Sequence, residues 1–102
     1  MNEIATEKRY AIIETGQLTV GDLRIGVGNF WPEAYPDENN QPQPVPTCGL
    51  WFYVRNHPEQ DRHERVRSGH VTEIAGYRID VEGIEREADE QSMVLLIITP
   101  LG

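Results

Sequence analysis

The chain has 102 residues and a formal net charge of −8, from 17 acidic and 9 basic residues. That length suits a single domain built around one hydrophobic core. The negative charge argues against nucleic acid or an anionic membrane as a partner, because both require a concentrated positive patch. It is compatible with a basic protein partner, or with a charge that only keeps the chain in solution.

The single cysteine, Cys48, cannot form an internal disulfide, so the composition gives no sign of an oxidising compartment. The first nine residues lack the apolar segment of a signal peptide, although a chain beginning at a mature N-terminus would look the same. The longest apolar run, 93–98, is far shorter than the roughly 20 residues of a membrane span. We therefore expect a cytoplasmic protein.

In chain order, the polar residues 1–8 predict a frayed end, an extended run follows over 9–15, Gly16 and Gln17 predict a turn, and 18–20 continue in extended form. Residues 23–27 alternate apolar and small or polar side chains, as in a strand with one covered face.

Residues 31–47 contain five prolines: Pro32, Pro36, Pro42, Pro44 and Pro46. Proline lacks a backbone donor and fixes φ, so neither a helix nor a central strand is expected there. We predict one long Pro-rich loop, and a loop of this length in a compact domain is usually functional or mobile.

The run 48–55 alternates most clearly, with Leu50, Phe52 and Val54 on one side and Trp51, Tyr53 and Arg55 on the other. It predicts the strand around which the domain is organised. A polar connection over 56–64 follows, then extended runs over 65–74 and 77–82. Residues 85–91 are a charged connection, in which one turn of helix is considered. The last run, 92–99, is apolar on both sides, which predicts a central strand covered from two sides.

About seven short extended runs, separated by turn residues and without a helical stripe, predict an all-β fold. We expect residues 1–102 to form one small antiparallel β-sandwich or barrel of about seven strands. A faint internal similarity is also present: 16–19 followed by 23–27 resembles 69–72 followed by 77–81, with a one-residue insertion. Either a true repeat or two hairpins built on the same rules would produce it.

Three histidines fall close together among carboxylates, and His57, Asp61 and His63 are the best candidates for a divalent transition metal site. No recognised metal-binding spacing is present, so a solvated hairpin tip is the competing interpretation. Nucleophilic catalysis has weaker support: Ser68 and His70 would share a strand face without an oxyanion-hole motif, and Cys48 has the context of a structural thiol. The pattern thus favours a binding protein without a cofactor over an enzyme.

The aromatic residues are more informative. Trp31 and Tyr35 lie at the start of the Pro-rich stretch, while Trp51 and Tyr53 share the outer face of the organising strand. If the Pro-rich stretch folds back over that face, rings and prolines form a second small core. If the face stays open, it offers large flat contact areas to a partner protein or a sugar.

We therefore predict a non-enzymatic domain that binds a macromolecular partner, potentially a basic protein. The expected contact residues are Trp31, Tyr35, Trp51, Tyr53 and Arg55. The alternatives are the metal site within 56–64 and a carbohydrate-binding module. An edge strand over 9–15 offers a route to homo-oligomers.

Overall fold

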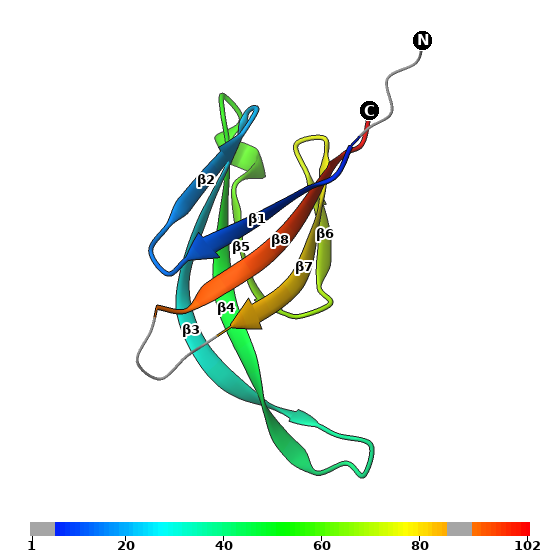
Figure 1. Ribbon diagram of the computed structural model, residues 1–102. Helices are drawn as coiled ribbons and strands as arrows, with labels where there is room; N and C mark the ends of the chain where they lie inside the picture. Colours follow the sequence, from blue (N-terminus) through cyan, green and yellow to red (C-terminus); the bar gives the residue numbers. More distant parts are fainter. Residues whose placement is uncertain (1–5, 86–90) are drawn as a thin grey trace.

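The structure, a computed structural model, describes residues 6–85 and 91–102, which form two antiparallel four-stranded sheets (Figure 1). The strands are β1 (Lys8–Ile13), β2 (Gln17–Val20), β3 (Leu23–Pro36), β4 (Pro42–Val54), β5 (Arg62–Arg67), β6 (Val71–Ile74), β7 (Tyr77–Glu85) and β8 (Met93–Pro100). Sheet A has the order β1-β8-β7-β6, and sheet B has the order β2-β3-β4-β5. The predicted all-β fold is confirmed, as a sandwich of two sheets.

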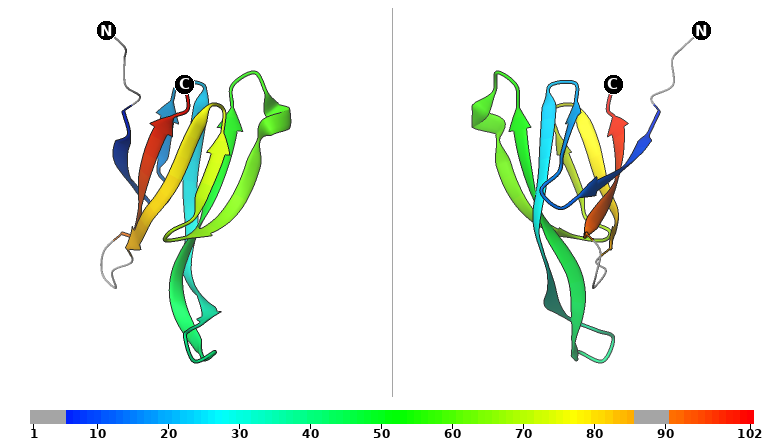
Figure 2. Two further views of the ribbon diagram at one scale, coloured as in Figure 1. Left: turned by 90° about the vertical axis from the view of Figure 1, so that its right-hand side faces the viewer. Right: turned by 60° about the vertical axis from the view of Figure 1, so that its left-hand side comes forward.

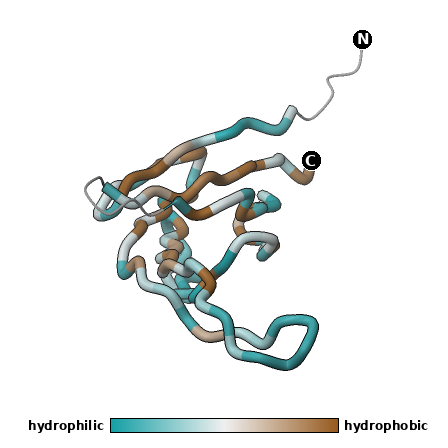
Figure 3. The backbone as a smooth tube through the Cα atoms, turned by 60° about the horizontal axis from the view of Figure 1, so that its bottom comes forward, coloured by the Kyte–Doolittle hydropathy of each residue, from teal (hydrophilic) through white to brown (hydrophobic). Residues whose placement is uncertain are grey.

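The core lies between the two sheets and is made by the predicted alternation. Leu23 and Ile25 on β3, Leu50 and Phe52 on β4, and Ile79 on β7 are completely buried. Figure 3 shows that the hydrophobic stretches of the chain lie in the body of the sandwich. Since every second side chain of a strand points to the same face, these positions form a single apolar cluster.

Helix is almost absent from the described residues. Residues 6–85 and 91–102 contain only the short 3-10 turn η1 (Pro58–Gln60), and no helix there is long and apolar enough to cross a membrane. β7 continues to Glu85, so the predicted charged connection begins later than expected. The helical turn considered for that connection falls mainly on residues 86–90, which lie outside the described part.

Residues 6–85 and 91–102 contain eight strands, where about seven were predicted. The run predicted over 65–74 is two strands, β5 in sheet B and β6 in sheet A, separated by a turn. Gly69 has a φ of +93° in that turn, a conformation that glycine adopts without steric cost. The polar residues Arg62, His63 and Glu64, predicted to lie in a connection, belong to β5.

The predicted Pro-rich loop is wrong. Residues 31–47 form the far end of a long β3–β4 hairpin that projects beyond the body of the sandwich (Figures 1 and 2). We call this projecting hairpin the arm. It gives the molecule a length of 49 Å against 28 and 27 Å in the other directions. The arm therefore does not fold back over the outer face of β4.

Proline fits this arm because the prolines follow the two-residue period of a strand. Pro32 faces Pro46 across the hairpin, and Pro36 faces Pro42. All five prolines occupy alternate positions, so their nitrogen atoms point to the outer edges of the arm, where no neighbouring strand needs a donor. β5 pairs with β4 only up to Thr47, which is where the series of prolines begins.

The last strand is central, as predicted, but it is covered on one face only. Val94, Leu96 and Ile98 of β8 are buried against sheet B. Leu95 and Ile97 point to the outer face of sheet A and are partly exposed. An apolar run on both sides of a strand thus does not require a third layer.

The internal similarity is a structural repeat. β1 and β5 begin at residues 8 and 62, and β2 and β6 begin at residues 17 and 71, a constant difference of 54. The turn contacts repeat with the same spacing: Thr15 N donates to Val27 O at 2.9 Å, and Gly69 N donates to Val81 O at 2.8 Å. No insertion is needed, so the one-residue insertion inferred from sequence is wrong. In each half the first strand crosses to the other sheet, since β1 pairs with β8 and β5 pairs with β4.

Replacement of Phe52 by alanine tests the assignment of faces on β4. Phe52 is fully buried, so we expect Phe52→Ala to lower the free energy of unfolding by about 3–5 kcal/mol in a urea titration. Tyr53→Ala, the neighbouring substitution on the outer face, is the control, and we expect it to cost about 1 kcal/mol or less. Equal losses for the two variants would contradict this assignment of faces.

Candidate binding face

Four aromatic residues predicted to make contacts lie along one face of the β3–β4 hairpin. Tyr53 and Trp51 lie on the outer face of sheet B, and Trp31 and Tyr35 continue that face on the arm. At about 3.3 Å per residue, the stripe from Tyr53 to Tyr35 is roughly 33 Å long. We call this row the aromatic stripe. Trp31 is 45% exposed and Tyr53 is 38% exposed.

A β-bulge determines which rings belong to the stripe. The register of β3 against β4 shifts between Gly28 and Trp31, where β3 contains one extra residue. Asn29 adopts a φ of +54° within this segment. An extra residue reverses the side-chain alternation, so Phe30 turns into the core and Trp31 turns outward. Without the bulge, Trp31 and Tyr35 would point to the opposite face of the arm from Trp51.

Each ring of the stripe is paired with a histidine or arginine side chain of sheet B: Tyr53 and Trp51 with a side chain of the neighbouring strand, and Trp31 and Tyr35 of β3 with side chains that reach across β4 from β5. The guanidinium carbons of Arg24, Arg65 and Arg67 lie 4.9, 3.6 and 4.1 Å from the ring centroids of Tyr53, Trp31 and Tyr35, respectively. Such contacts are attractive because the face of an aromatic ring is electronegative. The charged groups on this face are therefore mainly positive, although the chain as a whole is acidic.

A hydrogen-bonded network fixes the position of Trp31 at the base of the arm. Arg65 Nε donates to Glu33 Oε1 at 3.0 Å, and Arg65 Nη2 donates to Thr47 Oγ1 at 2.6 Å. Thr47 Oγ1 donates to the carbonyl oxygen of Trp31 at 2.7 Å. Thr47 is buried beneath these groups. The network links the arm to β5 and holds the guanidinium over the indole.

Trp51 packs on glycine. Its ring stacks on His63 with a centroid separation of 4.3 Å and an interplanar angle of 22°. Both rings lie over Gly49, where a Cβ atom would come within 2.9 Å of the indole and 3.0 Å of His63 Nε2. A Cβ atom at Gly28 on β3 would lie 3.4 Å from the edge of the same indole. The absence of a side chain at Gly49 is therefore what allows this stack.

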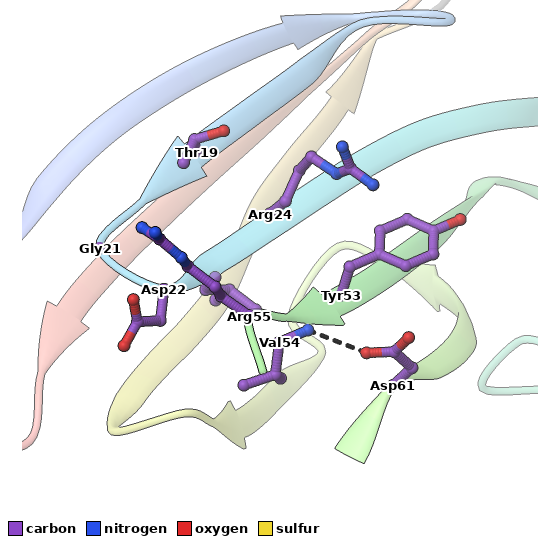
Figure 4. A pocket seen from close by; sticks show the side chains of 9 residues that line it. Thr19, Gly21, Asp22, Arg24, Tyr53, Val54, Arg55 and Asp61 are labelled. Carbon is purple, nitrogen blue, oxygen red and sulfur yellow. Dashed lines mark hydrogen bonds between the residues drawn. The ribbon is translucent and has the colours of Figure 1, made fainter. Parts of the chain in front are cut away.

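An open depression lies at the end of the stripe away from the arm (Figure 4). It has a volume of about 460 Å³, and Arg24, Tyr53 and the predicted contact residue Arg55 line it together with Thr19, Asp22 and Asp61. The depression joins the turn between β2 and β3 to the end of β4.

The three residues proposed for a metal site have other contacts. His57 Nδ1 lies 3.0 Å from Glu59 Oε1, Asp61 Oδ1 accepts the N–H of Val54 at 2.9 Å, and His63 stacks on Trp51. No group of three potential metal ligands occurs within residues 6–85 and 91–102. The geometry gives no support to a metal site in 56–64.

The candidate nucleophiles are likewise engaged. Burial raises the pKa of the Cys48 thiol to about 12, so at neutral pH it is a protonated core residue. Ser68 Oγ donates to the carbonyl oxygen of Glu82, while His70 Nε2 lies 2.8 Å from Glu64 Oε1. Ser68 and His70 therefore do not form the nucleophile–base pair considered from sequence.

The tip of the arm is organised by Asp37. Its Oδ1 accepts the backbone N–H groups of Asn39 at 2.8 Å and Gln41 at 2.9 Å. These hydrogen bonds, with that from Gln41 the largest effect, lower the pKa of the Asp37 carboxyl group. Residues 37–40 thus form the turn that closes the hairpin.

The aromatic residues of the stripe were predicted from the sequence, but the arginine and histidine side chains that stack on them were not. Arg24, Arg65 and Arg67 were not predicted to belong to the site, and His63 was assigned to a metal loop. A signal was present, because His63, Arg65 and Arg67 alternate along one side of what is now β5. It could be used only once β5 was known to pair with β4.

No family model matches this chain, and neither a curated protein nor a solved structure shows significant similarity to it.

Substitution of Gly49 tests the packing of Trp51. In a Trp31→Phe background, which leaves Trp51 as the only tryptophan, we expect Gly49→Ala to displace the indole and to change its emission and near-ultraviolet circular dichroism. The matched control is Gly26→Ala, whose new Cβ would lie 3.8 Å from Trp51 Cβ, an ordinary contact. Unchanged spectra for Gly49→Ala would show that the two rings do not stack over that glycine.

Proposed function

We propose that this domain binds a macromolecular partner, most simply a protein, through the aromatic stripe and the arginines stacked on it. The observation that carries the proposal is the alignment of four rings on one face, each in contact with an arginine or histidine side chain. Tryptophan, tyrosine and arginine are the residues that most often dominate binding energy at protein interfaces.

The arm supports contact through side chains rather than by strand addition. Prolines occupy both of its outer edges, so an incoming strand would meet missing N–H donors. Trp31, Glu33 and Tyr35 then provide one face of the arm for contact. The opposite face consists of exposed proline and alanine side chains: Pro32, Ala34, Pro36, Pro42, Pro44 and Pro46.

The charges on the stripe favour acidic groups at the contact. The net charge of the chain alone suggested a basic partner, but the cations on this face belong to Arg24, Arg65 and Arg67. A guanidinium group stacked on a ring keeps its N–H edge available for a carboxylate. The same stacking covers one face of three of the rings, which disfavours the carbohydrate-binding alternative because a sugar needs an open ring face.

The test is affinity capture on the full chain, followed by measurement of the dissociation constant of each captured protein. We expect Trp31→Ala to weaken binding by about tenfold or more, as for a buried aromatic anchor. Ile13→Ala, an exposed apolar position on the outer face of sheet A, is the control and should bind as the unmodified chain does. The proposal fails if Trp31→Ala and Trp51→Ala bind every partner normally, or if Ile13→Ala alone abolishes binding.

A further inference from the structure

The structural repeat allows the outer faces of the two sheets to be compared position by position. Arg24 on β3 corresponds to Arg78 on β7, and Gly26 corresponds to Asp80, with the same difference of 54 in residue number. On sheet A, Arg78 Nε lies 3.1 Å from Asp80 Oδ2. A second arginine of that face, Arg9, is paired with Glu82 at 3.2 Å. The arginines of the outer face of sheet A are therefore neutralised within the chain.

On sheet B, Glu33 pairs with Arg65 at the base of the arm, but the two positions that correspond to Asp80 and Glu82 carry no carboxylate. Gly26 and Gly28 stand where sheet A has Asp80 and Glu82. Within residues 6–85 and 91–102, neither Arg24 nor Arg55 makes an ion pair with a carboxylate. Instead, Arg24 stacks on Tyr53. Two guanidinium groups at one end of the aromatic stripe thus have donors available for an external acceptor.

These two arginines line the depression at the end of the stripe. Figure 4 shows Arg24 beside the Tyr53 ring and Arg55 on the other side of the depression, with the hydroxyl of Thr19 above the space between them. The two acids of the lining do not occupy this space. Asp61 points to the N–H of Val54, and Asp22 lies beyond Arg55, at the end opposite to Arg24.

The backbone around the depression is fixed before any ligand binds. Arg55 N donates to the carbonyl oxygen of Asp22 at 2.8 Å, which ties the β2–β3 turn to the end of β4. Gly21 in that turn has a φ of +57°, and a Cβ atom there would lie 2.5 Å from the hydroxyl oxygen of Tyr77. A preformed frame lowers the entropy lost on binding.

We propose that this depression binds a carboxylate group from an acidic segment of the protein partner. Arg24 and Arg55 donate to the carboxylate oxygens, and the hydroxyl group of Thr19 lies on the same side of the depression as a further donor. The proposal rests on the proposed function, because Tyr53 belongs both to the depression and to the aromatic stripe. It identifies the acidic group that such a partner would place at this end of the face.

The test is a titration of the ¹⁵N-labelled full chain, followed by NMR at the arginine Nε–Hε signals. The probes are pentaglutamate, the neutral peptide pentaglutamine and inorganic phosphate. We expect pentaglutamate to produce saturable shifts at Arg24 and Arg55, and pentaglutamine to produce none. No saturable shift with pentaglutamate, or saturation with phosphate alone, would overturn the assignment of the site to a carboxylate.

Gly26→Asp is the decisive variant, because it places a carboxylate next to Arg24 at the position where Asp80 pairs with Arg78 on sheet A. We expect it to neutralise Arg24 within the chain and to weaken pentaglutamate binding about tenfold. Gly26→Ala adds the Cβ without the charge, and Arg78→Gln removes the corresponding arginine on sheet A; both should bind normally. Arg24→Gln gives a second route to the same loss if Gly26→Asp is poorly folded. Unchanged affinity in Gly26→Asp or in Arg24→Gln contradicts the proposal.

Trp31→Ala separates this inference from the proposed function. Trp31 lies far along the stripe from the depression, so its loss should leave pentaglutamate binding unchanged while it weakens the partner. If the peptide fails to bind but Trp31→Ala still releases the partner, only the carboxylate site is wrong. If Trp31→Ala and Trp51→Ala both bind every partner normally, the proposed function fails whatever the peptide does.

Discussion

The β-bulge between Gly28 and Trp31 is the constraint on which the candidate binding face depends. Before it, even-numbered positions of β3 point outward, and after it odd-numbered positions do. This reversal allows Phe30 to complete the core and Trp31 to join Trp51 on the outside. It also assigns all the prolines of the arm to one face and leaves Trp31, Glu33 and Tyr35 on the other. One extra residue thus converts a strand of the core into a projecting arm with an aromatic face.

The two halves of the chain use one backbone plan for different surfaces. The outer face of sheet A carries ion pairs between side chains, and partly exposed aliphatic residues of β8 such as Ile97. Sheet B has Trp51 at the position of Ile97, since each faces the corresponding residue of the preceding strand. The two halves also differ on the inner faces of the sheets. Tyr10 and Leu18 pack on the core, whereas Glu64, which corresponds to Tyr10, accepts hydrogen bonds from its neighbours. The fold therefore accounts for the similarities, and the differences on the outer face of sheet B lie at the proposed binding face.

Much of the sandwich was predictable because period-two alternation directly reports the buried face of a strand, as in Leu50–Val54. The arm was not, because the rule that proline disrupts strands takes no account of proline at every second position, where all the missing donors share one edge. The rings of the site were predictable from composition and alternation. The pairing of Arg65 with Trp31 and of Arg24 with Tyr53 was not, because it depends on which strands are neighbours and on their register.

If the aromatic stripe is an open surface bordered by cations, ionic quenchers should distinguish the charge around Trp31. In a Trp51→Phe variant, Trp31 is the only tryptophan, and it lies exposed beside Arg65. We expect iodide to quench its emission more strongly than caesium does, despite the net charge of −8, and Arg65→Gln to reduce that preference. Stronger quenching by caesium, or protection from both ions, would contradict the account.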